Sequence, residues 1–169
     1  SSLESFKKLR TNLMYTENLK VISLTSSIPD EGKTVIAFNL AYAFAQTGKK
    51  VCLVDCDLRR TSLKEYLMLT KHHDGVSELL TNQGKDGLNS TNIDNLYIML
   101  AGKTPPNPSE ILSSSHFTDM IETLREQFDY VIIDTPPVAA GSDATVVSRA
   151  VDGTVFVLRN EFTSKKIAK

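Results

Sequence analysis

The feature that most constrains the fold of this chain is the alternation of short apolar segments with segments of helical spacing. Strand-like runs rich in β-branched residues occupy 20–25, 50–56, 96–100, 130–134 and 154–158. Helices are predicted at 3–15, 34–46, 63–69, 76–80, 115–128 and 142–150, and another near Pro108. A run such as 50–56, apolar almost throughout, is typical of a strand buried on both faces. The alternation predicts an α/β fold, with a mostly parallel β-sheet and helices on both faces.

The remaining segments contain no pattern that indicates a catalytic or binding site. The polar stretch 81–95 is predicted to be a surface loop, and the last residues to begin a helix. Cys52 and Cys56 lie in or beside an apolar strand and are expected to be buried thiols. The three histidines are expected at the surface, without a third ligand spaced for a metal.

Size and charge exclude several classes of protein. The 169 residues suit a single domain, and 19 Lys+Arg against 20 Asp+Glu leave no basic excess for nucleic acid. No apolar run approaches the roughly 18 residues of a membrane span.

A candidate phosphate-binding loop follows the first predicted strand. The segment SSIPDEGKT runs from Ser26 to Thr34 and leads directly into a helix, the context of a P-loop. Gly32 allows the backbone close to a phosphate, Lys33 would reach the β- and γ-phosphates, and Thr34 would bind Mg²⁺. Ser27 occupies the first glycine position, so the loop is of the deviant Walker type. The alternative is a capped helix with a solvated Lys33.

Acidic residues end two further strands. Asp55 and Asp57 follow the second strand, and Asp134 ends the fourth, where parallel strands place their ligands. Buried carboxylates are costly unless they meet a metal or hydrogen-bond donors, so the three predict a Mg²⁺–nucleotide site. Asp55 and Asp57 would share one face of an extended chain, one orienting Mg²⁺ and the other accepting a proton. One aspartate could instead cap the next helix.

Two arginines follow the second strand directly. Arg59 and Arg60 could contact phosphate or an acidic partner. Solvated loop arginines are an equally weighted alternative.

Several segments together resemble the bacterial tyrosine kinases of capsule and exopolysaccharide synthesis. SSIPDEGKT resembles their Walker A loop, VCLVDCDLRR their Walker A′ motif, and YVIIDTPP their Walker B motif. PPNPSEILSS resembles the stretch after their third strand. Glu4, Lys7 and Arg10 resemble their E-x-x-R-x-x-R motif, with Lys in the middle place. The alternative for these three is a salt-bridged solvent face.

The resemblance implies an ATP-dependent protein-tyrosine kinase that autophosphorylates in trans and regulates capsular or exopolysaccharide synthesis and export. It implies an oligomerisation helix at 1–18, with Glu4, Lys7 and Arg10 in the subunit contacts of a ring, and a nucleotide-binding core at 19–169. Implied site residues are Lys33, Asp55 and Asp57 for catalysis; Thr34, Asp55 and Asp134 for metal; and Pro29, Asp30, Glu31, Gly32, Lys33, Thr34 and Val35 for ATP or ADP with Mg²⁺.

The same resemblance implies partners and a location. These are a transmembrane activator or polysaccharide co-polymerase, fused or separate, protein tyrosine substrates and a cognate phosphatase, with no nucleic acid. The kinase would be cytoplasmic, at the inner face of the cell membrane.

Some features depart from the family. Asp30 replaces a usual Gly and Thr61 a common Pro. A C-terminal βα unit of the family is expected to be missing, because the sequence stops at Lys169, within the predicted start of a helix after the fifth strand. A tyrosine-rich tail is also expected to be missing, because the tyrosines are scattered at Tyr15, Tyr42, Tyr66, Tyr97 and Tyr130. Two other readings stay open. One is a ParA/MinD-like partitioning or positioning ATPase. Ile28 argues against it, because those proteins carry a signature lysine at this position. The other is a catalytically weak nucleotide-dependent scaffold.

Overall fold

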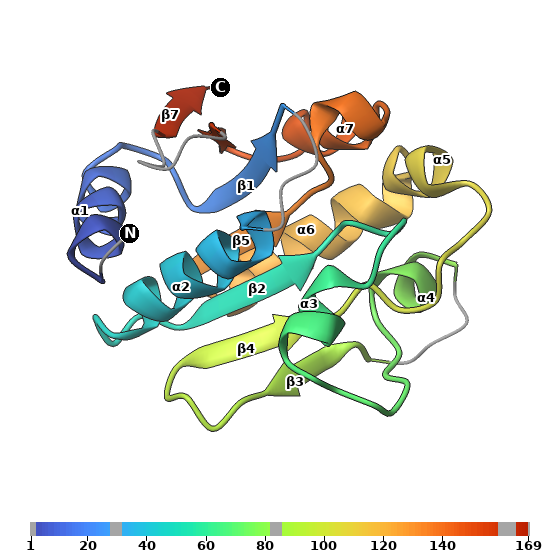
Figure 1. Cartoon of the computed structure of the whole chain (residues 1–169), viewed down its shortest axis with the longest axis horizontal. Helices are drawn as coiled ribbons and strands as arrows, with labels where there is room; N and C mark the ends of the chain where they lie inside the picture. Colours follow the sequence, from blue (N-terminus) through green and yellow to red (C-terminus); the bar gives the residue numbers. More distant parts are fainter. Residues whose placement is uncertain (1–2, 28–31, 82–85, 159–164, 169) are drawn as a thin grey trace.

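A twisted β-sheet forms the centre of the molecule (Figure 1). The computed structural model describes residues 3–27, 32–81, 86–158 and the backbone of 165–168. Within them seven strands lie in the order β3-β4-β2-β5-β1-β6-β7. Their bounds are β1 Val21–Ser26, β2 Val51–Asp55, β3 Leu88–Ser90, β4 Leu96–Met99, β5 Tyr130–Asp134, β6 Gly153–Val157 and β7 Lys165–Ala168. The five inner strands are parallel, and β3 and β7 pair antiparallel at the two edges.

Helices cover both faces of the sheet, as the alternation predicts. One face carries α1 (Leu3–Met14), α2 (Lys33–Ala45) and α3 (Ser62–Tyr66). The other carries α4 (Val76–Leu80), α5 (Pro108–Leu112), α6 (Ser115–Gln127) and α7 (Asp143–Ser148). A 3₁₀ turn, η1 (Val138–Ala140), precedes α7. The α/β prediction is confirmed.

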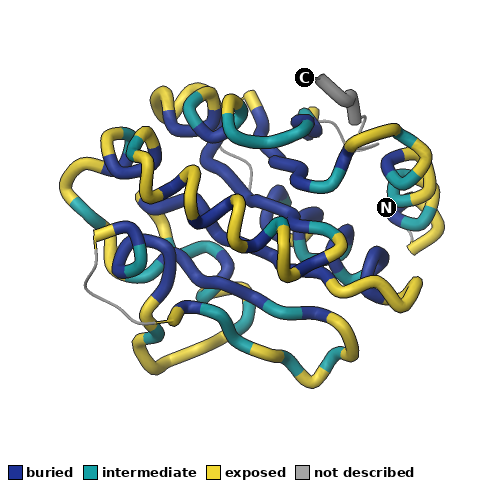
Figure 2. Tube along the Cα trace, turned by 180° about the vertical axis from the view of Figure 1, so that it is seen from behind, coloured by how far each residue is buried: buried dark blue, intermediate teal, exposed yellow. Residues whose placement is uncertain are grey.

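Each central strand feeds two separate cores, because successive side chains point to opposite faces. In β2, Val51 and Leu53 pack in the core under α2, while Cys52 and Val54 pack under α6. All five residues of β2 are buried, which explains its continuous apolar sequence. Figure 2 shows the same pattern, with buried chain along the central strands and exposed chain on the outer surfaces of the helices. Cys52 and Cys56 are free, buried thiols, as expected.

Two expectations are wrong, both at sheet edges. Part of the 81–95 segment forms β3, which pairs with β4 through Leu88 and Met99. The chain end forms β7 against β6, with Ala168 opposite Thr154, where the sequence indicates a helix. Edge strands supply hydrogen-bond partners to the backbone of the outermost parallel strands. The short polar sequences of such strands do not reveal that the neighbouring strand needs these partners.

Among the helices in the part of the chain that the structure describes, none combines the length and apolarity needed to cross a bilayer.

Candidate functional site

The predicted site residues meet at the carboxyl ends of β1, β2 and β5. In the register of the sheet, Asp134 of β5 lies opposite Asp55 of β2 on one side and Leu24 of β1 on the other. The carboxyl end of β1 therefore lies beside Asp134. Thr135 strengthens this junction, since its hydroxyl donates to the carbonyl of Leu24 at 2.6 Å.

Lys33 and Thr34 begin α2 and both reach Asp134. The Lys33 ammonium forms an ion pair with Oδ1 of Asp134, and the Thr34 hydroxyl donates to Oδ2 at 3.1 Å. Lys33 is only 4% exposed and Asp134 only 1%. The alternative of a solvated Lys33 is therefore wrong. Ile28, Pro29, Asp30 and Glu31 of the loop lie outside the described residues.

Asp57 brings a third buried carboxylate to this place. Its side chain is 4% exposed, and its Oδ1 atom has no hydrogen-bond partner among the described residues. Burial raises the pKa of Asp57, and the charge of Asp134 adds to this effect while Lys33 opposes it. A buried carboxylate oxygen without a donor fits a hard cation such as Mg²⁺, which prefers oxygen ligands.

Asp55 is turned toward the backbone instead. Its Oδ1 accepts the N–H of Asp57 at 2.9 Å and its Oδ2 accepts the N–H of Leu63 at 3.3 Å, in the first turn of α3. Burial raises the pKa of Asp55, as does the neighbouring Asp134. The helix-capping alternative is therefore realised by Asp55. β2 ends at Asp55, and Asp57 opens the turn that follows, in which the N–H of Arg60 donates to the carbonyl of Asp57 at 3.4 Å.

A cleft of about 680 Å³ opens beside these groups. Such a volume suits a drug-sized or nucleotide-sized ligand. Its lining consists of Lys33, Thr34, Val35, Asp57, Arg59, Arg60, Ser62, Glu65, Tyr66, Pro136, Pro137 and Ala140. Sequence reasoning missed Ser62, Glu65, Tyr66 and Ala140, which no motif marks. Pro136 and Pro137 belong to the segment YVIIDTPP, which also contains Asp134, and this segment indicates their position.

The two arginines differ in their surroundings. Arg59 forms a bidentate ion pair with Asp143 of α7, so it is not a freely solvated side chain. Arg60 is exposed at the cleft. Asp143 was not among the predicted site residues, because it lies nine positions beyond Asp134 in the predicted helix 142–150, which no motif marks.

The N-terminal helix packs on α2 within the same chain. Arg10 donates from Nη1 to the carbonyl of Ala43 at 2.9 Å, near the end of α2. Glu4 is exposed and Lys7 half-buried. Arg10 thus anchors α1, and a role of the three residues between subunits stays a prediction.

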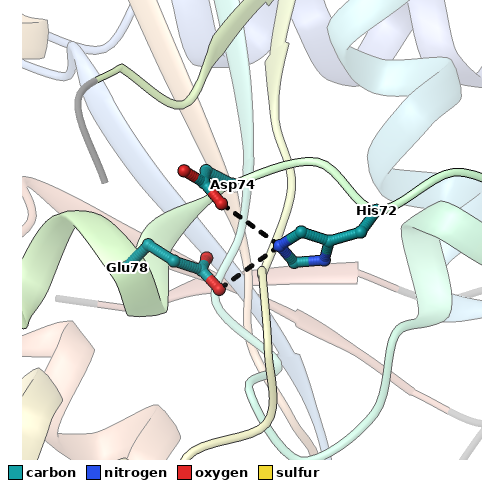
Figure 3. A group of neighbouring side chains, drawn as sticks. All are labelled: His72, Asp74 and Glu78. Atoms are coloured by element: carbon teal, nitrogen blue, oxygen red, sulfur yellow. Dashed lines mark hydrogen bonds and ion pairs between the residues drawn. The ribbon is translucent and has the colours of Figure 1, made fainter. Parts of the chain in front are cut away.

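His72 belongs to a cluster of side chains away from the cleft lining (Figure 3). Its Nε2 atom lies 3.2 Å from Oδ1 of Asp74 and 3.6 Å from Oε2 of Glu78. His72 is exposed, as expected, but the expectation that no third ligand is spaced for a metal is wrong, because α4 brings Glu78 back over the turn beside His72 and Asp74. Glu78 accepts the N–H of Gly75 at 2.8 Å and that of Lys103 at 3.0 Å, so the cluster fixes the start of α4.

Comparisons with known proteins agree with this geometry. The family model described as "AAA domain" matches residues 19–147. A tyrosine-protein kinase, CpsD of Streptococcus pneumoniae, is 39% identical over 166 residues, which are 96% of this chain and 73% of that protein. The putative tyrosine-protein kinase CapB of Staphylococcus aureus is 34% identical over 171 residues, covering 98% of this chain and 75% of CapB.

Solved structures give the same assignment. The kinase domain of the Escherichia coli tyrosine kinase ETK superposes with a TM-score of 0.88 at 32% identity, covering 97% of this chain and 66% of that one. MinD of Pyrococcus horikoshii, with Mg-ADP, has a TM-score of 0.68 at 24% identity over 82% of this chain and 57% of MinD, and shows the shared fold. The chain thus belongs to the bacterial tyrosine-protein kinases, within the P-loop ATPase fold.

Proposed function

We propose that this chain transfers the γ-phosphoryl group of ATP·Mg²⁺ to tyrosine side chains. The observation that carries the proposal is the convergence of Lys33, Thr34, Asp134 and Asp57 at one cleft. The names of the relatives support tyrosine as the acceptor.

Each residue has a separate part in this reaction. Lys33 exchanges its ion pair with Asp134 for the phosphates of ATP, and Thr34, Asp55 and Asp134 hold Mg²⁺ directly or through water. The ion neutralises phosphate charge when bound. Asp57 accepts the proton of the tyrosine hydroxyl as its oxygen bonds to the γ-phosphorus and ADP departs. Burial raises the pKa of Asp57, which makes its carboxylate a stronger base than an ordinary aspartate.

The wider biological role is also part of the proposal. The N-terminal segment 1–18, which contains α1, serves self-association into a ring, and 19–169 form the nucleotide-binding core. A transmembrane activator, fused or separate, holds the kinase at the inner face of the membrane, where it regulates capsular or exopolysaccharide synthesis together with a phosphatase. The match covers 22% of the tyrosine-protein kinase Wzc of Salmonella typhimurium but 73% of CpsD, so a fused and a separate activator both stay in the proposal.

The test mixes the purified chain with γ-labelled ATP, Mg²⁺, a tyrosine-tailed relative and an activator fragment. Label should appear on tyrosine and disappear in Lys33→Met, whereas exposed Lys49→Met should retain it. Phosphate release without phosphotyrosine would instead support a ParA/MinD-like ATPase. Nucleotide binding without turnover would support a scaffold.

A further inference from the structure

The PPNPSE segment takes no part in the chemistry above, yet it contacts the site. Ser109, the second residue of α5, donates its hydroxyl hydrogen bond to Oδ1 of Asp143. Asp143 is the first residue of α7, which lies beside α5 (Figure 1). Arg59 reaches the same carboxylate, with Nε 2.9 Å from Oδ2 and Nη2 3.1 Å from Oδ1. Three segments far apart in the sequence therefore meet at one guanidinium group.

The Asp143 carboxylate is fully buried. Burial alone would raise its pKa, but hydrogen bonds from Arg59 and Ser109 outweigh this and hold the pKa below its ordinary value. Two parallel N–H···O bonds to a buried acceptor fix the plane of a guanidinium group, which a single contact does not. Ser142 extends the network, with its Oγ 3.2 Å from that of Ser109.

The network connects directly to the nucleotide cleft. Arg59 lines that cleft together with Lys33 and Asp57. The backbone N–H groups of Arg59 and Arg60 donate to the Asp57 carboxylate. Two carboxylates therefore hold the turn 57–60. That of Asp57 accepts hydrogen bonds from the backbone of the turn, and that of Asp143 holds the side chain of Arg59.

We propose that Asp143 and Ser109 are positioning residues that hold Arg59 at the rim of the cleft, where its guanidinium contacts the phosphates of bound ATP. This inference rests on the proposed function and gives the PPNPSE segment a part in it. It also selects phosphate over an acidic protein as the partner of Arg59. An arginine already oriented by a buried carboxylate loses little side-chain entropy when it meets phosphate.

The test is a double-mutant cycle on the affinity for a fluorescent ATP analogue with Mg²⁺. Arg59→Ala and Asp143→Asn should each weaken binding roughly tenfold, the loss expected for one hydrogen bond to a charged group. The double variant should bind no more weakly than Arg59→Ala, because Asp143 acts through Arg59. The inference would be overturned if the affinity losses of the two single variants multiplied in the double variant. It would also be overturned if Arg59→Ala bound ATP as tightly as wild type, and that result would point to an acidic partner for Arg59.

A serine series separates positioning from a loss of folding. Ser109→Ala should weaken ATP binding and Ser109→Thr should restore it, while Ser113→Ala, at an exposed serine of the same segment, should not change it. If Asp143→Asn does not fold, this series decides alone, and equal affinity in Ser109→Ala and wild type contradicts positioning. Binding is measured apart from phosphotransfer, so a wild type that binds ATP without phosphorylating tyrosine overturns the proposed function and not this inference.

Discussion

Replacing Asp57 with Asn should stabilise the nucleotide-free protein while it abolishes phosphotransfer. The carboxylate is 4% exposed, its Oδ1 has no partner among the described residues, and the Asp134 charge is close enough to raise its pKa further. Its ionised form is therefore disfavoured in the folded state. An amide of the same shape carries no charge into this site and still offers an oxygen to the N–H groups of Arg59 and Arg60.

The size of the effect follows from the burial of Oδ1. An unsatisfied buried polar atom costs about 1–3 kcal/mol, and the lost attraction between Asp57 and Lys33 offsets part of the gain. We expect a rise of about 1–2 kcal/mol in the free energy of unfolding, or roughly 2–8 °C in Tm for a chain of this size. Because the folded pKa lies above the unfolded one, ionised Asp57 destabilises the wild type increasingly as pH rises through the folded pKa. The advantage of the variant should shrink as pH falls toward about 4, the ordinary pKa of Asp.

The assay is thermal and urea unfolding of both proteins, with and without ATP and Mg²⁺. At a ligand concentration about 100 times the Kd, the wild type should gain about 2.7 kcal/mol, and the variant far less. The order of stability should therefore reverse when ATP and Mg²⁺ are added. Asp94→Asn, at an exposed aspartate, should change neither measurement. A nucleotide-free Asp57→Asn that is less stable than wild type would refute the reasoning.

Three further predictions concern the scaffold. Asp152→Asn should lower the free energy of unfolding, measured in urea at neutral pH, by about 1–2 kcal/mol. The reason is that Oδ2 of Asp152 accepts hydrogen bonds from Lys20, Val21 and Arg125. These bonds outweigh burial and lower the pKa of Asp152, so the loss should shrink in acid as pH approaches the folded pKa; a pH-independent loss would contradict this. Gly75→Ala should cost about 1–3 kcal/mol in the same assay, since its Cβ would lie 2.0 Å from the Leu100 carbonyl oxygen; a neutral variant would show that this backbone can shift. Burial raises the pKa of both Cys52 and Cys56, so alkylation followed by mass spectrometry should modify them only after unfolding, and rapid native labelling would contradict their placement.

Sequence reasoning succeeded where the signal is local. The strands and α2 follow from apolar runs and helical spacing, and Lys33, Thr34 and Asp134 follow from motifs at the ends of those elements. It failed for β3 and β7, whose formation depends on the exposed edges of β4 and β6. It also missed the contact between His72 and Glu78, which forms only when α4 folds back over the preceding turn.

By itself, the sequence determined the α/β architecture, the nucleotide loop and the acidic residues beside it, because backbone periodicity and strand–loop–helix motifs are written in neighbouring residues. Only the tertiary structure decided what these residues do to one another. It buried the Lys33–Asp134 pair, turned Asp55 toward the backbone and left Oδ1 of Asp57 without a donor among the described residues. It also joined Arg59 to Asp143 across 84 residues. Such contacts depend on how the helices pack on the sheet, and packing is a property of the whole chain.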